Sequence, residues 1–368
     1  MQFHRLLCAF SVLLFITAPA LTLNADEFEN VLNRPDSLSG WQETGSATFE
    51  RNEDQLSLQQ GEATLKFDFP LQTGSWSFTL DCPESFQGKV VARFESSKES
   101  HVLELVNSEI ASSTGTTTPA FEISSSEIKW NRGDQEPLVH TRQSAAPLFL
   151  SLTLASASSE PVTLSGMKVV ETNFKSLFNG TDLTGWEGGG QPADVCWKVE
   201  EGCIVCTGLK KGPWLRTAEE YGDFNLRIEY WLSAEGNSGL YVRVPEDGNH
   251  HRDNKDLPEA GFEIQLLDDG ADVYKAMNLK DYQYTGSVYD IVGANEHVGK
   301  GPGTWNTLEL NCNGQHITTI HNGKMIVNAS EEHYPLLSLR KVKGYLGLQN
   351  HSSVVKFRNL RLGPALDY

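Results

Sequence analysis

Glu263 and Gln265 offer a carboxylate and an amide that can act together on one substrate. Side chains alternate between the two faces of a strand, so both point one way while the other face is apolar, with Phe262, Ile264 and Leu266. A carboxylate transfers protons and an amide binds hydroxyl groups, which is the chemistry of a sugar-processing site. The same alternation is typical of a half-buried strand with a solvated polar face. The choice between the two depends on what other strands bring to this face.

Three other segments can place side chains beside Glu263. They contribute Asn237, Tyr241 and Arg243 from residues 237–243, Tyr289 from residues 285–290, and Gln349 and His351 from residues 347–351. Amides and arginine bind sugar hydroxyls, aromatic rings stack on the sugar ring, and a Glu–His pair exchanges protons. Trp305 and Tyr289 are candidates for stacking, but either ring can equally belong to a sandwich core. Residues 237–239 can equally form only a turn, because Asn and Gly are usual turn formers.

His250 and His251 lie in a long polar interval, residues 245–260. Adjacent side chains on an extended segment point apart, whereas metal sites use spacings that converge the ligands. We therefore predict that both histidines are rim or solvated residues.

The cysteines have a structural pattern. A single Cys203-x-x-Cys206 motif without a second pair is a weak zinc motif. Residues 195–199 and 203–207 are predicted strands around a three-residue turn, which places Cys196 opposite Cys206 for a contact or a disulfide. Nothing around these thiols indicates the low pKa that a reactive cysteine needs.

Strands dominate the rest of the chain. Short apolar or alternating runs fall at residues 63–69, 75–80, 89–94, 101–106 and 147–154, and again at 225–232, 239–244, 305–312, 316–320, 324–328, 344–351 and 354–362. Asn322-Gly323 is a strong hairpin signal, because both residues tolerate positive φ. Residues 112–118 are predicted as a loop and residues 217–221 as one helical turn. This pattern predicts an all-β chain of antiparallel sandwiches.

Bulk properties limit the partners. The chain has 368 residues and a formal net charge of −18, which disfavours nucleic acid and anionic membranes. Residues 1–25 have a short polar start, an apolar run and small residues suited to cleavage, so they are predicted to be a signal peptide. The apolar run is too short to span a membrane. We expect a secreted or periplasmic protein without membrane insertion, with one β-sandwich domain of unknown role over residues 26–172 and a second domain over residues 173–368.

The second half carries ordered motifs of a known family. They are residues 177–186 (LFNGTDLTGW), 221–226 (YGDFNL), 237–239 (NSG), 261–265 (GFEIQ), 286–290 (GSVYD), 303–306 (GTWN), 322–323 (NG), 347–351 (GLQNH) and 357–359 (FRN). With them, residues 174–363 resemble the 3-keto-disaccharide hydrolase domain, also called DUF1080 or the 3-keto-α-glucoside-1,2-lyase/3-keto-2-hydroxy-glucal hydratase domain. One departure is Ser352, where the family often has Gly. The resemblance implies a concanavalin A-like jelly roll over residues 173–368, preceded by the other β-sandwich.

The resemblance also implies an enzyme acting on 3-keto glycosides or oligosaccharides by proton abstraction at C2 and elimination at C1. Glu263 and His351 are then the catalytic acid/base pair, and Arg243, Gln265 and Gln349 orient the sugar or its developing oxyanion. A divalent metal bridging the keto and hydroxyl oxygens is a further expectation, with Glu263 and His351 equally candidates as its ligands.

Two alternatives stay open. A jelly roll also serves lectins, so a non-catalytic carbohydrate-binding protein is the first. A laminarinase-type glycoside hydrolase is the second, but that mechanism needs two carboxylates at a set separation, and Gln265 stands where its strand would carry an acid.

Overall fold

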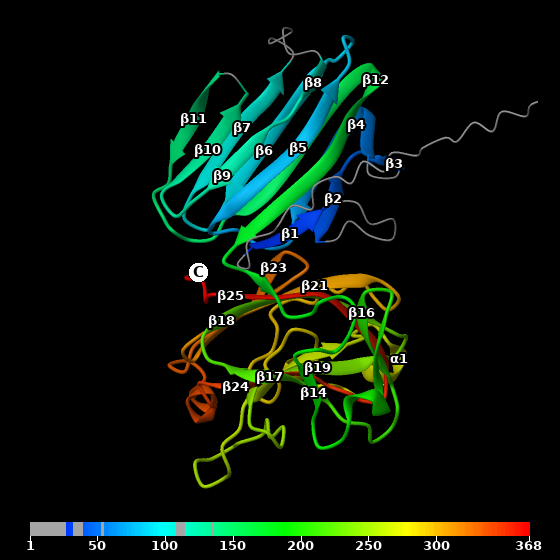
Figure 1. Cartoon of the computed structure of the whole chain (residues 1–368), viewed down its shortest axis with the longest axis vertical. Coiled ribbons are helices and arrows are strands. Elements are labelled where there is room, and N and C mark those ends of the chain that lie inside the picture. The colour runs from blue at the N-terminus through cyan, green and yellow to red at the C-terminus, as the bar shows by residue number, and fades with distance from the viewer. Residues whose placement is uncertain (1–26, 32–39, 53–54, 108–114, 134) are drawn as a thin grey trace, which may run out of the picture.

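The computed structural model describes residues 27–31, 40–52, 55–107, 115–133 and 135–368. The predicted signal peptide, residues 1–25, lies outside the described residues. Strands dominate, and the prediction of an all-β, jelly-roll architecture is confirmed. Figure 1 shows a strand-rich N-terminal unit above a C-terminal sandwich. Of the helices in the described ranges, none has the length and apolar character that crossing a membrane requires.

The N-terminal unit is built around one long strand, β12 (Phe149–Thr172). Its first half pairs with β6 and its second half with β5, so a single strand takes part in both layers that enclose the core. The prediction of a shorter strand at residues 147–154 missed this continuity. The other strands are β1 (Glu27–Val31), β2 (Trp41–Gly45), β3 (Glu50–Asn52), β4 (Gln55–Phe67), β5 (Gly74–Cys82), β6 (Gly88–Glu95), β7 (Ser100–Asn107), β8 (Gly115–Thr117), β9 (Ala120–Ile123), β10 (Glu127–Arg132) and β11 (Gln135–Thr141).

The C-terminal unit has two antiparallel sheets. The larger, eight-stranded sheet contains β13 (Lys175–Ser176), β15 (Trp197–Glu200), β16 (Cys203–Thr207), β18 (Phe224–Leu232), β21 (Trp305–Asn313), β22 (His316–His321), β23 (Lys324–Ala329) and β25 (Val354–Gly363). The five-stranded sheet has the order β14 (Trp186–Gly188), β17 (Leu215–Tyr221), β24 (Gly344–Leu348), β19 (Asn237–Val244) and β20 (Phe262–Leu267). Short helices η1 (Ala193–Val195), α1 (Asp272–Ala276), η2 (Asp281–Gln283) and η3 (Pro335–Leu339) lie in the connections.

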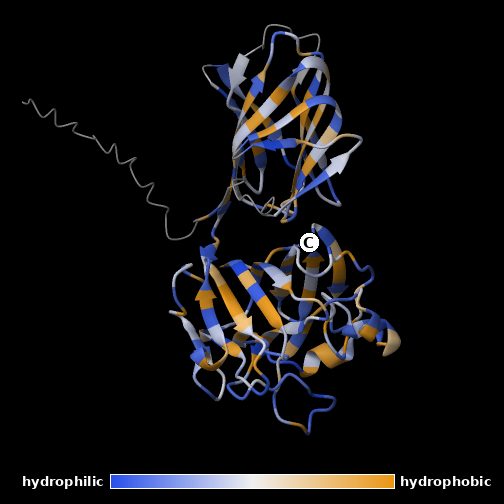
Figure 2. Cartoon of the chain, turned by 90° about the vertical axis from the view of Figure 1, so that its right-hand side faces the viewer, coloured by the Kyte–Doolittle hydropathy of each residue, from blue (hydrophilic) through white to orange (hydrophobic). Residues whose placement is uncertain are grey.

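Alternating apolar residues bind these two sheets together. On β20, Phe262, Ile264 and Leu266 are fully buried in the core between the sheets, as the alternation predicts. Figure 2 shows hydrophobic residues in bands along the strands of both units. Glu263 and Gln265 consequently face away from this core, towards the connecting loops.

Of the local predictions, one is confirmed and two are corrected. The Asn322-Gly323 hairpin between β22 and β23 is confirmed, with φ of 47° and 71°. The helical turn at residues 217–221 is wrong, because this segment pairs with β24 as the end of β17. Residues 115–117 form the short strand β8 rather than a loop, and residues 112–114 lie outside the described residues. 

The cysteine hairpin also differs from its prediction. A two-residue turn pairs Trp197, not Cys196, with Cys206, and the five described cysteines, all buried, are free thiols. The connection is one residue shorter than predicted, so the register moves by one. The predicted contact is confirmed, because the side chains of Cys196 and Cys206 interact as free thiols, whereas the alternative of a disulfide is not formed.

Buried charges join the two units. Arg227 and Arg361 both donate to the Glu171 carboxylate, and all three residues are fully buried. A second contact has the Thr307 hydroxyl donating to the Asp68 carboxylate at 2.9 Å. Burying charges without partners is costly, so these pairings fix how the N-terminal unit sits on the larger sheet of the sandwich.

Candidate functional site

The site is set by the register of three neighbouring strands. Tyr241 on β19 pairs with Glu263 on β20 on one side and with Gly347 on β24 on the other. Two residues along, Gly239 pairs with Gln265, and its carbonyl accepts the Gln349 backbone N–H at 2.9 Å. Residues at matched positions on adjacent strands point to the same face. The sheet therefore brings the predicted polar residues together on its outer face.

Two loops enclose this face. The Tyr289 backbone N–H donates to the Glu263 carbonyl, and the Gly286 N–H to the Gln265 carbonyl, so residues 284–290 run along the free edge of β20. The other loop is residues 245–260. Together they leave a polar pocket of about 150 Å³ lined by Asn237, His250, His251, Glu263, Gln265, Tyr289, Gln349 and His351.

Glu263 and His250 form a close pair inside this pocket. Glu263 Oε2 lies 3.3 Å from His250 Nε2, and the Glu263 side chain is only 5% exposed. His250 Nδ1 lies 3.0 Å from the Gly248 carbonyl, which can only accept, so Nδ1 carries the ring proton of the neutral imidazole. His250 Nε2 then accepts, and the hydrogen bond to it comes from a protonated Glu263.

The electrostatics agree with that assignment. Burial raises the pKa of Glu263 to about 8, opposed by a hydrogen bond from Gln349 and reinforced by the nearby Asp290. Burial also lowers the pKa of His250. Desolvation disfavours the charged form of each group, so at pH 7 the pair holds one proton and no net charge. The pKa of Tyr241 rises to about 12, again mainly by burial.

Gly239 has no side chain, and this makes room for the Glu263 carboxylate. A Cβ at position 239 would lie 2.2 Å from Glu263 Oε1, so only glycine leaves the carboxylate its place. With its amide nitrogen turned toward the acceptors, Gln265 donates to Glu263 Oε1 at 3.3 Å and to the Ser238 carbonyl at 3.0 Å. Both carboxylate oxygens thus have a neighbour that fixes their orientation.

Gln349 presents an unused acceptor. Its Nε2 donates to the Tyr241 hydroxyl at 3.2 Å, while its Oε1 is buried and has no hydrogen-bond partner in the described part of the chain. An unmatched buried acceptor is costly, and a ligand hydroxyl in the pocket would satisfy it. Tyr241 itself forms the pocket's outer support, because its ring stacks on His250 at 4.5 Å.

His251 and Asp290 form a second acid–imidazole pair at the rim. His251 Nδ1 lies 2.9 Å from Asp290 Oδ2, and the His251 side chain is 52% exposed. The rings of His250 and His251 are 4.1 Å apart, so the prediction that they point apart is wrong. The His251 N–H donates to Asn249 Oδ1, and the loop turns here instead of extending. The sequence showed both histidines but not this turn; the position of Asp290 opposite them had no sequence signal.

Arg243 does not reach the site. It lies at an irregularity of β19 with φ of 52°, and its fully buried side chain leaves the pocket face. Its guanidinium donates to the carbonyls of Gly222 at 2.9 Å and Gly314 at 2.6 Å and pairs with Asp223 at 3.0 Å. Strand alternation therefore fails at this residue, and its role is to hold loops together.

Trp305 is also outside the site. It begins β21 in the larger sheet, where it pairs with Trp231, and the Arg358 guanidinium lies 3.9 Å above its ring. The pocket residues all belong to the five-stranded sheet or its loops. The other predicted residues, Asn237, Gln265, Tyr289, Gln349, Glu263 and His351, do line the pocket, and Tyr241 supports it.

The pocket does not form an evident metal centre. In the ranges that the structure describes, no three or more His, Cys, Asp or Glu side chains are grouped to hold a metal ion. Of the two predicted ligands, Glu263 already directs one oxygen to His250 and the other to Gln265. Both Glu263 oxygens therefore already have protein neighbours, and a metal held by Glu263 and His351 stays a prediction.

Several known proteins are similar to part of this chain. The chain is 24% identical over 258 residues to a 3-keto-disaccharide hydrolase of Bacteroides thetaiotaomicron, covering 60% of this chain and 88% of that protein. A solved Parabacteroides distasonis structure, provisionally described as a glycosyl hydrolase, is 25% identical with a TM-score of 0.43 over 53% of this chain and 94% of its own. A carbohydrate-binding module from Bacillus subtilis, CBM66, is 12% identical with a TM-score of 0.34 over 50% of this chain and 98% of its own.

The model of one protein family matches residues 173–363, which include every strand and loop that builds the pocket. The chain belongs to the family of the 3-keto-alpha-glucoside-1,2-lyase-like domain.

Proposed function

We propose that this protein is an enzyme that cleaves 3-keto glycosides, with the polar pocket around Glu263 as its active site. The observation that carries the proposal is the buried Glu263–His250 pair, 3.3 Å apart, whose carboxyl pKa is raised to about 8. A carboxyl group with a pKa near neutrality is suited to proton transfer at physiological pH. The family and the Bacteroides relative support the substrate class.

The reaction begins at the proton on C2, which the neighbouring C3 ketone acidifies. The Glu263 carboxylate takes this proton, and the C–H electron pair forms the enediolate. His250 Nε2 assists by accepting a hydrogen bond from the carboxyl group that forms when Glu263 takes the C2 proton. The Gln265 amide, which donates to Glu263 Oε1, and the Gln349 amide both stabilise the carboxylate form.

The second step breaks the bond between C1 and its oxygen. The enediolate re-forms the C3 ketone, a C1–C2 double bond appears, and the departing oxygen takes a proton. Two imidazoles that line the pocket could give this proton to the departing oxygen. One is His351, and the other is His251, whose Nδ1 is paired with Asp290. Addition of water, oxygen to C1 and hydrogen to C2, completes net hydrolysis.

Substrate hydroxyls would meet Asn237, Tyr289 and the unpaired Gln349 Oε1. The Gln283 amide donates to the Tyr289 hydroxyl at 3.1 Å, which leaves the hydroxyl proton for a sugar oxygen. The metal and the export of the protein both stay predictions. Sugar release measured with and without a chelator tests the metal.

The deciding experiment offers the purified protein a disaccharide and its 3-keto derivative and follows sugar release. Turnover of the keto form alone supports the proposal. Turnover of the unoxidised sugar supports the laminarinase-type hydrolase, and binding without release supports the lectin. Glu263→Gln should lower release from the keto sugar by roughly a hundredfold or more, with the fold retained.

The leaving-group acid has its own test. A variant lacking that acid should be slow on a 3-keto glucoside with an alkyl leaving group and nearly normal on one with a nitrophenyl leaving group, which departs without protonation. Comparing His251→Gln with His351→Gln on both substrates identifies the donor. If neither variant discriminates between the leaving groups, neither imidazole is the acid.

A further inference from the structure

A second cavity, of about 310 Å³, lies beyond the other end of β20. Glu263 and Gln265 line the polar pocket, whereas Leu267, Asp268 and Asp269, further along the same strand and its exit, line this cavity. The two share no lining residue. Ligand pockets usually measure about 300–1,000 Å³, so the second cavity is large enough for a small ring-shaped ligand.

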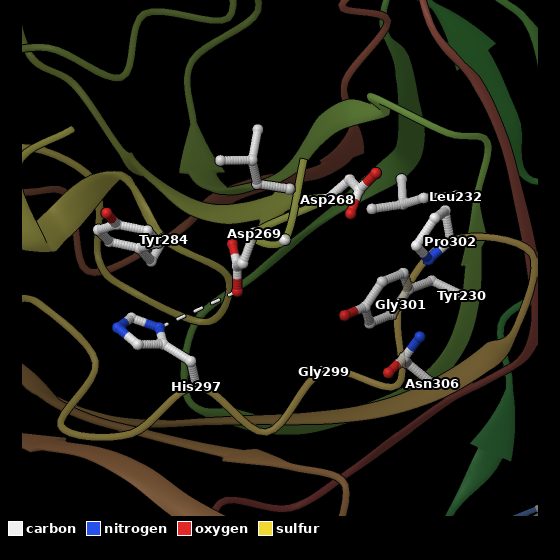
Figure 3. Close-up of a pocket in the computed structure, with 12 residues that line it drawn as sticks. Tyr230, Leu232, Asp268, Asp269, Tyr284, His297, Gly299, Gly301, Pro302 and Asn306 are labelled. Carbon is white, nitrogen blue, oxygen red and sulfur yellow. Dashed lines mark ion pairs between the residues drawn. The ribbon is translucent and has the colours of Figure 1, made fainter. Parts of the chain in front are cut away.

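The cavity presents a fixed acceptor. Asp269 Oδ1 accepts both the backbone N–H and the hydroxyl of Thr285, at 3.0 and 3.1 Å, and these bonds lock the side chain. Its other oxygen, Oδ2, lies 4.0 Å from His297 Nδ1, longer than a hydrogen bond. Figure 3 shows this carboxylate on the cavity wall, with the Tyr230 hydroxyl facing it from the other side.

Tyr230 supplies the donor. It is 2% exposed, and its hydroxyl lies 2.8 Å from Nε2 of the fully buried His321. His321 is neutral, because burial lowers its pKa to about 3, and its Nδ1 has no partner in the described part of the chain. An unmatched buried acceptor costs less than an unmatched N–H, which favours the ring proton on Nε2. His321 then donates to Tyr230, and the Tyr230 proton is left for the Thr285 side chain or for a ligand in the cavity.

The remaining walls are apolar or small. Leu232, Leu267 and Pro302 line one part, the Tyr284 ring packs on His297 at 4.5 Å, and Gly299 and Gly301 leave the opposite side open. Of the described residues lining the cavity, none is lysine or arginine. Phosphates and carboxylates would therefore meet the acidic side chains without compensation.

We infer that this cavity is a second binding site for a neutral, monosaccharide-sized polyol, separate from the pocket around Glu263. A sugar hydroxyl both donates and accepts, so adjacent hydroxyls satisfy Asp269 Oδ2 and the Tyr230 proton together, while the apolar walls cover the ring's C–H face. An ammonium ligand would satisfy Asp269 but would offer nothing to Tyr230, because it has no acceptor.

The test titrates the full chain with methyl α-D-glucopyranoside, a glycoside without a ketone, and follows the His297 Cε1 proton by NMR. His297→Gln identifies that resonance. The signal should shift to saturation in the wild type. Binding should weaken about tenfold in Tyr230→Phe and in Asp269→Asn, which keeps the Oδ1 acceptor for Thr285. Tyr334→Phe, an exposed tyrosine elsewhere, is the matched control and should bind normally, and thermal melts show that each variant is folded.

Three results overturn the inference: no saturable shift in the wild type, equal binding by Tyr230→Phe and the wild type, or a shift with methylammonium but none with the glycoside. The readout needs no turnover, so it does not depend on the proposed function. If the protein were inactive on 3-keto glycosides but still bound the glycoside in this way, the proposed function would be wrong and the second binding site would stand.

Discussion

Glu263 Oε2 and His250 Nε2 lie 3.3 Å apart, from a strand and from a loop more than ten residues before it. The acid and the imidazole are both neutral because they are buried, and the one ring proton of His250 is on Nδ1, which donates to the Gly248 carbonyl. One proton therefore lies between a carboxyl and an imidazole, in a polar pocket of about 150 Å³. Such a pair titrates as a unit.

The pH dependence of the reaction follows from this pair. If the Glu263 carboxylate is the base, only the form that has lost its proton is active, and burial raises the pKa of Glu263 to about 8. The kcat/KM for a 3-keto disaccharide should rise about tenfold per pH unit below pH 7 and level off above about 8. A rate profile between pH 5 and 9.5 checks this. An ascending limb centred between pH 4 and 5 would show that the base does not have the raised pKa of the buried Glu263.

Gly239 offers a substitution that moves the carboxylate without altering it. A Cβ at this position would lie 2.2 Å from Glu263 Oε1, so in Gly239→Ala the carboxylate must shift. A displacement of about 1 Å can cost around a hundredfold in rate, and we expect a fall in kcat/KM of that order. Gly222→Ala is the control, because its Cβ would meet its nearest neighbour, the Val342 carbonyl, at an ordinary 3.6 Å. Unchanged activity in Gly239→Ala would mean that the carboxylate position is unimportant.

The face of β20 was predictable, and the reason is strand periodicity. Phe262 and Ile264 had to be buried together, which left Glu263 on the other face. Gln349, predicted for the same face, directly follows β24, which pairs with β19. The prediction failed where periodicity fails. Arg243 sits at a strand irregularity with positive φ, so its side chain leaves the face that alternation assigned to it.

The histidine loop was not predictable in the same way. An extended backbone would have separated the rings of His250 and His251, but side-chain hydrogen bonds from Asn249 turn the loop and bring the rings 4.1 Å apart. Such a turn depends on the Glu259 carbonyl, which accepts from Asn249 across the loop. Contacts between residues distant in sequence decide the geometry here, and a local pattern carries no information on them.

Arg243 is expected to act on stability rather than on catalysis. Its guanidinium satisfies the Gly222 and Gly314 carbonyls and pairs with Asp223. Arg243→Met should lower the free energy of unfolding by roughly 1–3 kcal/mol, because the partly buried Gly222 and Gly314 carbonyls lose their donor, while kcat/KM of the folded fraction stays normal. Urea denaturation and steady-state kinetics measure the two effects, with the exposed Arg51→Met as a control. If the variant kept full stability but lost activity, Arg243 would act on the substrate after all.

Asp68 at the junction between the two units should make stability depend on pH. It is fully buried and accepts hydrogen bonds from Gln42 and from Thr307, yet burial raises its pKa from the ordinary 3.8 to about 6. Between these two values the folded protein keeps a proton that the unfolded chain has lost. Stability from this group is therefore fully present below pH 3.8 and falls as the pH rises through 6, by up to about 3 kcal/mol.

Asp68→Asn isolates that contribution, because asparagine cannot ionise and its Oδ1 still accepts from Thr307. Other carboxyls titrate over the same range, so the informative quantity is the difference in unfolding free energy between variant and wild type. This difference, variant minus wild type, should increase by up to about 3 kcal/mol when the pH is raised from 4 to 7.5. Urea denaturation at the two pH values measures it. A difference that stays constant, or one that falls with rising pH, would mean that Asp68 is charged throughout and that Gln42 and Thr307 compensate its burial in full.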